Sequence, residues 1–185
     1  FHKSRLVVAV EHPPYPRFFC PIDNMLGGVM GRCVGQDEIT LLNVEDIEGH
    51  KTPIGCAVCY ESVYGEYYTD YIRKGARAMT IITNDAWWGD TPGYRQHLSY
   101  ASLRAIETRR AIARCANTGI SAIISPSGEI MQPTPWWEQA VIKGQIPLRD
   151  DITFFVSHGD ITGRVCSFIH WLLLLALIVR FITRR

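Results

Sequence analysis

A cysteine ends a short apolar segment that has the composition of a buried strand. Residues 54–59 follow a proline and precede polar residues, and Cys59 is the last residue of the segment. A second apolar segment, residues 79–83, comes after a stretch of helical character and ends at Asn84 and Asp85. Strand, helix and strand at this spacing predict a βαβ unit, and reactive groups gather beyond the carboxyl ends of its strands. A thiolate at Cys59 could therefore act as a nucleophile.

Two other interpretations of Cys59 stay open on these residues alone. Free cysteine often behaves as a small buried hydrophobe, which would make Cys59 structural. Cys56 and Cys59 also form a C-x-x-C pair, a pattern found in redox and metal sites. Positions three apart on a strand face opposite ways, and the sequence has no second C-x-x-C or H-x-x-x-H to complete a metal site. We therefore predict no metal and no cofactor.

Composition and charge argue against two classes of protein. The chain has 185 residues, of which 47% are hydrophobic and 20% charged, enough for one globular domain with a core. A formal net charge of +1 predicts no electrostatic attraction to nucleic acid. Six cysteines at irregular spacing predict no disulfide framework. The sequence begins at Phe1 with neither an initiator methionine nor a signal peptide, so we expect a piece of a longer protein.

The N-terminal part contributes charged residues and a long segment rich in turn formers. Residues 3–11 are a strand-like apolar stretch with Lys3 at one end and Glu11 at the other. Residues 12–37 are rich in proline and glycine, which predicts an irregular loop, and loops of this length are typical of lids and binding segments. Residues 39–44 predict an edge strand.

Aromatic residues follow each strand of the predicted βαβ unit. Tyrosines in residues 62–74 lie about one helical turn apart, which favours a helix that packs one face against the sheet. Trp87 and Trp88 follow the second strand, at the same edge of the sheet as Cys59. The tryptophans could either cover the core or line an apolar substrate site.

The following residues predict one helix and two strands. Residues 93–117 repeat apolar side chains at helical spacing and are predicted to form one long helix. The segment Asn117-Thr118-Gly119 at its end is a typical helix stop signal. Residues 120–125 and 140–146 are predicted as strands.

An apolar stretch near the C-terminus differs from the others in length and pattern. Residues 165–182 are apolar except for one serine, one histidine and one arginine. A buried core helix is the alternative to a membrane helix, but this stretch has no polar face and approaches the roughly 20 residues that span a bilayer. We predict a transmembrane helix, with the basic residues 183–185 as a cytoplasmic tail and the globular residues 1–160 on the other side.

Taken together, these motifs resemble the nitrilase, or carbon–nitrogen hydrolase, superfamily, and within it the apolipoprotein N-acyltransferase family. The motifs are Lys3 and Glu11, Cys59-Tyr60-Glu61, Asn84-Asp85-Ala86-Trp87-Trp88-Gly89, residues 104–110 and Asn117-Thr118-Gly119-Ile120-Ser121. The resemblance covers nearly the whole chain in the same order and includes a terminal membrane helix, which soluble relatives lack. It implies an α/β fold, in which this chain is the C-terminal part of an αββα sandwich followed by the transmembrane helix.

The resemblance implies a Glu-Lys-Cys triad that this chain holds in part. Cys59 would be the nucleophile and Lys3 the triad lysine. The glutamate that acts as the base lies upstream of the lysine in the family, so we expect it before Phe1. The backbone N–H of Tyr60 would contribute to an oxyanion hole beside Lys3.

Further site residues are implied by the same resemblance. Glu11 matches a second active-site glutamate and Glu61 the one that follows the nucleophile, while Trp87 and Trp88 would line a lipid-binding mouth. One departure is that residues 6–11 lack the proline and glycine that precede this glutamate in the family. The departure could change how the segment presents Glu11.

The implied activity is a two-step acyl transfer. A fatty acyl group would move from a phospholipid to Cys59 as a thioester, and then to the N-terminal diacylglyceryl cysteine of an apolipoprotein. The implied location is the bacterial inner membrane with the catalytic domain in the periplasm, and the partners are the phospholipid donor, the apolipoprotein acceptor and the membrane. Two alternatives stay open: a nitrilase-type amidohydrolase acting on a small amide or nitrile, and a non-catalytic membrane-anchored domain.

Overall fold

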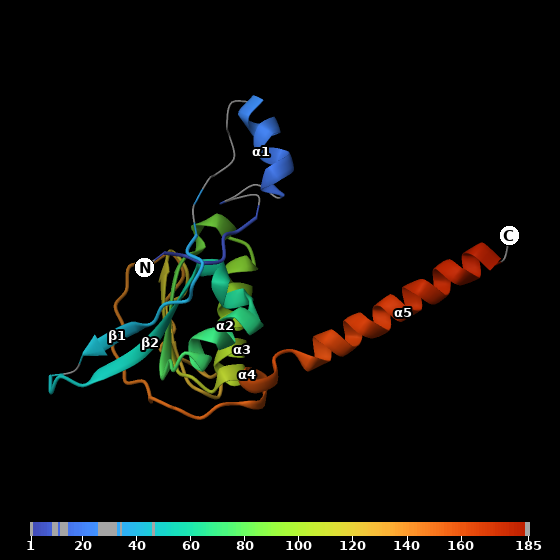
Figure 1. The fold of residues 1–185 in the computed structure, drawn as a ribbon. Helices are drawn as coiled ribbons and strands as arrows, with labels where there is room; N and C mark the ends of the chain where they lie inside the picture. The colour runs from blue at the N-terminus through green and yellow to red at the C-terminus, as the bar shows by residue number, and fades with distance from the viewer. Residues whose placement is uncertain are drawn as a thin grey trace.

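The part of the chain that the structure describes forms a six-stranded mixed sheet with helices packed on one face, and a long helix extends away from this domain (Figure 1). A computed structural model describes residues 2–8, 11, 15–25, 33, 35–45 and 47–183. The strands, which lie in the sheet in chain order, are β1 (Leu42–Glu45), β2 (Lys51–Val58), β3 (Ala78–Asn84), β4 (Ile112–Asn117), β5 (Ala122–Ile124) and β6 (Ile130–Met131). The helices are α1 (Pro16–Met25), the 3₁₀ helix η1 (Cys59–Val63), α2 (Gly65–Arg73), the 3₁₀ helix η2 (Asp85–Trp88), α3 (Gly93–Thr108), α4 (Phe154–His158) and α5 (Ile161–Thr183).

The centre of the sheet is parallel, which confirms the predicted βαβ unit. β2 pairs in parallel with β3, and β3 pairs in parallel with β4, whereas the outer pairs are antiparallel. The carboxyl ends of β2, β3 and β4 therefore lie at one edge of the sheet. Cys59 follows β2 and Asp85 follows β3 at this edge, as the sequence predicts.

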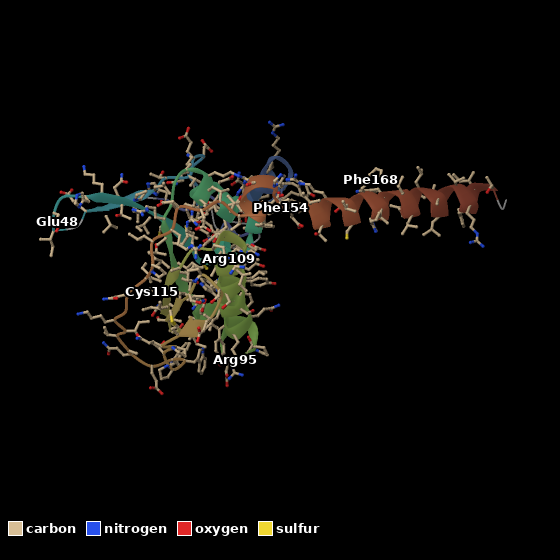
Figure 2. The ribbon with its side chains drawn as sticks, turned by 90° about the horizontal axis from the view of Figure 1, so that it is seen from below. Glu48, Arg95, Arg109, Cys115, Phe154 and Phe168 are labelled. Carbon is tan, nitrogen blue, oxygen red and sulfur yellow. The ribbon has the colours of Figure 1, made fainter. Side chains whose placement is uncertain are left out.

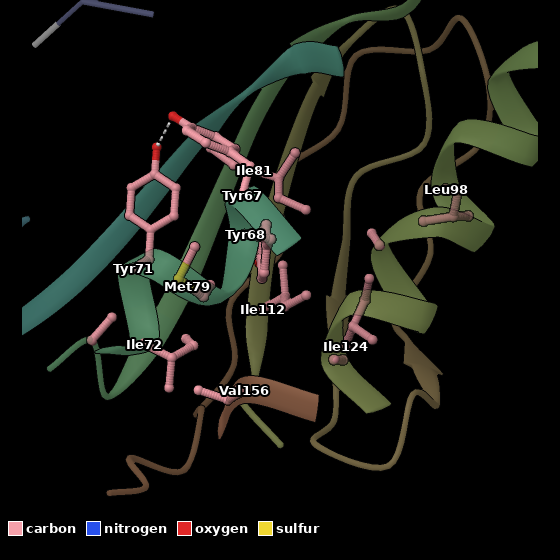
Figure 3. Close-up of a cluster of buried hydrophobic side chains, with 14 of the residues drawn as sticks. Tyr67, Tyr68, Tyr71, Ile72, Met79, Ile81, Leu98, Ile112, Ile124 and Val156 are labelled. Carbon is pink, nitrogen blue, oxygen red and sulfur yellow. Dashed lines mark hydrogen bonds between the residues drawn. The ribbon is translucent and has the colours of Figure 1, made fainter. Parts of the chain in front are cut away.

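The core lies between the sheet and the helices α2, α3 and α4. Alternation along β3 points Met79 and Ile81 toward the helices, where both are buried. The helix face that they meet carries Tyr68 and Tyr71, which are also fully buried. The predicted packing role is confirmed for these two and for Tyr67, whereas Tyr64 precedes α2 and is 42% exposed. Figure 3 shows the three buried rings between the strands and the helices.

The opposite face of the sheet is partly covered by an extended segment (Figure 1). Residues 140–144 line a groove of about 770 Å³ together with side chains of β2, β3 and β4. The prediction of a strand over residues 140–146 is wrong, because these residues cross the sheet without joining a strand ladder in the described structure. The segment approaches closely at Gly144, where an added Cβ would lie 2.2 Å from Ile123 Cδ1.

The predicted helix over residues 93–117 is wrong in its second half. α3 ends at Thr108, and Arg109 adopts the left-handed conformation with φ of 52°. The chain then enters β4, whose first residue Ile112 is fully buried between β3 and β5. Apolar residues in this stretch fit helical spacing, but pairing with two neighbouring strands overrides that local pattern. The stop signal at Asn117 therefore ends a strand, not a helix.

A helix also interrupts the segment that the sequence predicts to be an irregular loop. α1 (Pro16–Met25) stands away from the sheet (Figure 1) and contains Pro21. Proline is well tolerated at the first position of a helix, as at Pro16, which weakens its value as a breaker signal. Residues 12–14, 26–32 and 34, also part of that prediction, lie outside the described residues. A lid function for the segment stays a prediction.

α5 exposes its apolar side chains along its whole described length. It has 23 residues, none of them buried, and by length and composition it is the one described helix able to cross a membrane. Figure 2 shows it extending alone from the domain, with Phe168 along its length and Phe154 near its base. The predicted stretch 165–182 lies inside this helix.

Candidate active site

Cys59 occupies a strained turn directly after β2. It is the first residue of η1 and has φ of 55°, a conformation that residues other than glycine rarely adopt. The prediction that Cys59 is the last residue of the strand is therefore wrong by one position, because the chain leaves the ladder after Val58. Cys59 is partly exposed, whereas Cys56 is buried in β2 and burial raises the pKa of its thiol. Of the two thiols, only Cys59 is placed to react.

Glu61 ties the segment that carries Lys3 to the turn that carries Cys59. Its carboxylate is fully buried and accepts backbone N–H bonds from Ser4 at 2.6 Å and Arg5 at 2.8 Å through Oε1. The other oxygen, Oε2, accepts the N–H of Val58 at 2.7 Å. Tyr67 Oη also donates to Glu61 Oε1, at 3.1 Å. Residues some 57 positions apart are thus held together by one side chain.

Lys3 and Glu11, the two ends of the predicted N-terminal motif, form a close ion pair. Lys3 Nζ lies 2.8 Å from Glu11 Oε1 and 2.6 Å from Oε2. The backbone N–H of Val7 donates to Glu11 Oε2 at 2.6 Å, which folds the segment back on itself. The Lys3 side chain is 11% exposed and that of Glu11 27%. This pair keeps a partly exposed ammonium group at a fixed place on the segment that Glu61 anchors.

A second network of buried side chains contacts the main-chain carbonyl of Cys59. Ser62 Oγ donates to that carbonyl at 2.9 Å, and His97 Nε2 lies 3.3 Å from it. His97 Nδ1 lies 2.9 Å from Asp85 Oδ1, and Arg114 Nη2 lies 2.7 Å from Asp85 Oδ2. Burial alone would raise the pKa of Asp85, but the hydrogen bond from His97 and the charge of Arg114 lower it overall. Asp85 is therefore held as a carboxylate.

Two aromatic residues of the predicted site, Tyr60 and Trp88, flank His97. The rings of Tyr60 and Trp88 lie 6.3 and 6.5 Å from the His97 ring, measured between centroids. Trp88 is 37% exposed and Trp87 is 78% exposed. Trp88 thus belongs to the wall of the site, while Trp87 presents a free apolar surface beside it. The roles of Tyr60, Trp87 and Trp88 in binding or catalysis stay predictions.

Three members of this site were not singled out from the sequence. Ser62 follows the Cys-Tyr-Glu motif, His97 lies on α3 and Arg114 lies on β4. Charged or polar residues in otherwise apolar elements were the available signal, because buried charges are rare unless they are paired. The sequence could not show that α3 and β4 direct His97 and Arg114 to one carboxylate, or that Ser62 meets His97 at the carbonyl of Cys59.

Chemically, the site combines a partly exposed thiol in a strained turn with an ammonium group on the segment that Glu61 ties to that turn. A thiol needs a base to become a good nucleophile, and a cation or N–H group can stabilise the oxyanion that follows its attack on a carbonyl. This arrangement suits acyl transfer through a thioester.

Comparison with known proteins identifies relatives of the chain. Residues 1–151 match the family model described as carbon–nitrogen hydrolase. The chain is 35% identical over 183 residues to the apolipoprotein N-acyltransferase of Chlorobaculum tepidum, which covers 97% of the chain and 34% of that protein. It is 29% identical over 184 residues to the apolipoprotein N-acyltransferase of Thermotoga maritima, covering 100% of the chain and 34% of that protein. The chain therefore spans about a third of the length of these curated relatives.

A solved structure supports the fold. The NitN amidase from Nesterenkonia sp. AN1 aligns with a TM-score of 0.51 over 75% of this chain and 47% of the amidase, at 16% sequence identity. At this identity the likeness concerns the fold alone. It agrees with the predicted α/β class and with a nitrilase-like arrangement of sheet and helices.

Proposed function

The chain belongs to the carbon–nitrogen hydrolase family, and on that premise we propose that it is the C-terminal part of the catalytic domain of an apolipoprotein N-acyltransferase. The observation that carries the proposal is the strained turn at Cys59, joined through Glu61 to the segment that holds the Lys3–Glu11 pair. The names of the relatives supply the reaction and the acceptor, N-acylation of an apolipoprotein, and the family resemblance adds a phospholipid as the acyl donor.

In the first step, a base takes the proton of Cys59 Sγ as the sulfur attacks the ester carbonyl of a phospholipid. The C–O bond of the ester then breaks, the lysophospholipid leaves with a proton, and the acyl group stays on sulfur as a thioester. Lys3 and the backbone N–H of Tyr60 stabilise the oxyanion, and the loss of one such donor typically raises the barrier by about 3 kcal/mol. The base is the glutamate that the family places upstream of Lys3.

In the second step, the α-amine of the diacylglyceryl cysteine attacks the thioester carbonyl. The C–S bond breaks, an amide forms, and Cys59 recovers its proton. Glu11 keeps the Lys3 ammonium oriented through both steps, and Glu61 keeps the Lys3 segment beside the nucleophile. Trp87 and Trp88 provide an apolar surface for the acyl chains.

The length and apolar composition of α5 support a location of this chemistry at a lipid surface. Residues 165–182 would cross the bacterial inner membrane, with residues 183–185 in the cytoplasm and residues 1–160 in the periplasm. An amidohydrolase that passes the acyl group to water is the second candidate, favoured by the match to the carbon–nitrogen hydrolase family model. The exposed Trp87 and the apolar α5 favour the lipid substrate over a small amide.

The test is replacement of Cys59 by alanine in the full-length protein. We expect lipoproteins to stop at the diacyl form, and we expect the wild-type peptide carrying Cys59 to show a hydroxylamine-labile fatty-acyl adduct by mass spectrometry. Cys115→Ser is the matched control, because Cys115 is exposed on β4 and has no role in the proposal. Normal triacylation by C59A, or a Cys59 peptide that stays free when phospholipid is supplied without acceptor, would overturn the proposal.

A further inference from the structure

We propose that His97 is a positioning residue for Cys59, which connects the buried Asp85–Arg114 ion pair to the main-chain carbonyl of the nucleophile and holds Cys59 in its left-handed conformation. This inference rests on the proposed function, because it concerns the presentation of the same thiol.

The carbonyl oxygen of Cys59 is held from two directions. Ser62 Oγ donates to it at 2.9 Å, and His97 Nε2 lies 3.3 Å away. Ser62 Oγ and His97 Nε2 are themselves 3.2 Å apart, so the three atoms form a closed triangle. A carbonyl oxygen has two lone pairs, and this contact set engages both. Because a left-handed cysteine is unfavourable by itself, the surrounding structure must impose the conformation, and these contacts act on the peptide group that follows Cys59.

His97 is buried and has a polar contact at each ring nitrogen. An ionised carboxylate and a carbonyl oxygen both only accept hydrogen bonds. The contact of Nδ1 with Asp85 Oδ1 at 2.9 Å therefore requires a proton on Nδ1, and the contact of Nε2 with the Cys59 carbonyl at 3.3 Å requires one on Nε2 as well. The His97 side chain is 2% exposed, and those of Asp85 and Arg114 are 0% exposed. The flanking rings of Tyr60 and Trp88 restrict rotation of the imidazole.

Asp85 is fixed in turn by elements on both of its sides. Thr83 Oγ1 donates to Oδ1 at 3.0 Å and Arg114 Nη2 donates to Oδ2 at 2.7 Å. Gly119 leaves room for the carboxylate, since an added Cβ would lie 2.2 Å from Asp85 Oδ2. The network therefore links β4 to the residues that follow its neighbours β2 and β3.

A histidine with only a packing role in the core would need no polar contact beyond its hydrogen bond with Asp85. Here the second ring nitrogen lies against the peptide of the predicted nucleophile and against Ser62, which binds the same carbonyl. This geometry points to a role in presenting the thiol.

The test compares two substitutions that each keep one nitrogen of the ring. The amide nitrogen of Gln takes the place of Nε2 in His97→Gln, whereas that of Asn takes the place of Nδ1 in His97→Asn. In the full-length protein in detergent, the rate at which iodoacetamide alkylates Cys59 is measured by peptide mass spectrometry, with exposed Cys115 as internal reference. We expect H97N to lower the Cys59 rate by roughly 10- to 100-fold, as displacement of a reacting group does. H97Q should retain most of the rate.

A purely structural histidine would give another pattern. If both variants react at the wild-type rate, or if H97Q loses as much rate as H97N while both stay folded, the proposal is wrong. Should neither variant fold, Ser62→Ala removes the other donor to the same carbonyl and leaves the His97–Asp85 contact in place. A folded S62A protein with an unchanged Cys59 rate would equally overturn the proposal, and a lowered rate supports it.

Alkylation separates this inference from the proposed function, because the reaction needs neither lipid nor lipoprotein. If acyl transfer proves wrong, the order of H97Q and H97N still tests the positioning role. If the positioning role is wrong, C59A still abolishes acyl transfer.

Discussion

Two buried carboxylates support the turn at Cys59, and they do so with different partners. All four donors that the structure records on Glu61 are uncharged: three backbone N–H groups and the hydroxyl of Tyr67. Asp85 is held instead by the guanidinium of Arg114, the ring of His97 and the hydroxyl of Thr83. Glu61 therefore joins main-chain segments, while Asp85 fixes side chains.

The difference has an energetic consequence. Loss of a carboxylate that binds neutral N–H groups leaves unmade hydrogen bonds, whereas loss of one that binds a buried guanidinium leaves an unpaired charge. We therefore expect Asp85 to matter more for stability and Glu61 to matter more for the geometry between Lys3 and Cys59.

The largest loss of stability is expected for Asp85→Ala. The Arg114 side chain is 0% exposed and would lose its partner, so the free energy of unfolding should fall by about 3–5 kcal/mol. Urea unfolding followed by tryptophan fluorescence measures it. Asp70→Ala is the control, because Asp70 forms an exposed ion pair with Arg73. Loss of that pair should lower the free energy of unfolding by less than about 1 kcal/mol. Equal losses for the two variants would show that Arg114 finds another partner.

Glu61→Gln should have a smaller effect on stability and a specific effect on the N-terminal segment. One carboxylate oxygen becomes an N–H₂ group that faces backbone donors, which should lower the free energy of unfolding by about 1–3 kcal/mol. We expect faster hydrogen exchange at the amides of Ser4 and Arg5, together with loss of acyl transfer. Asp85→Asn should leave those amides protected. Unchanged exchange in E61Q would mean that other contacts hold the segment.

Tyr67→Phe tests the side-chain contribution to the Glu61 cluster. The hydroxyl donates to Glu61 Oε1 and lies 3.0 Å from Tyr71 Oη (Figure 3), so its removal should reduce stability by about 1 kcal/mol. Thermal unfolding of the variant measures the change. Tyr64→Phe is the control, since Tyr64 is 42% exposed and lies outside the cluster of hydroxyls. A loss as small as that of Y64F would show that the backbone donors alone satisfy Glu61.

The smallest expected effect is the change with pH in the stability that the Asp85 carboxylate contributes. Burial acts to raise the pKa of Asp85, but the hydrogen bond from His97 and the charge of Arg114 outweigh it and lower the pKa. A depressed pKa contributes stability that is fully present above the unfolded value of about 4 and is lost as pH falls through the folded value. The stability difference between wild type and Asp85→Asn should thus be constant from about pH 7 to 5 and shrink below about 4. A decline that is complete by pH 5 would assign the dependence to another group.

The sequence alone determined the features that depend on local pattern. The βαβ unit follows from two apolar segments with a helix between them, and the place of Cys59 at the sheet edge follows from that unit. The buried face of tyrosines and the long apolar helix are likewise periodicities of neighbouring residues. The family resemblance, carried by short motifs in a fixed order, is also a property of the sequence.

Only the tertiary structure decided the features that depend on distant partners. Ile112 has apolar neighbours that fit a helix, and it becomes a strand residue because β3 and β5 supply hydrogen bonds on both sides. Residues 140–146 fit a strand, but no neighbour in the described structure pairs with them. The bond of Glu61 to Ser4 crosses 57 positions, and that of Arg114 to Asp85 crosses 29. Local propensity cannot encode such contacts, because the partners become neighbours only when the sheet assembles and places the ends of its strands together.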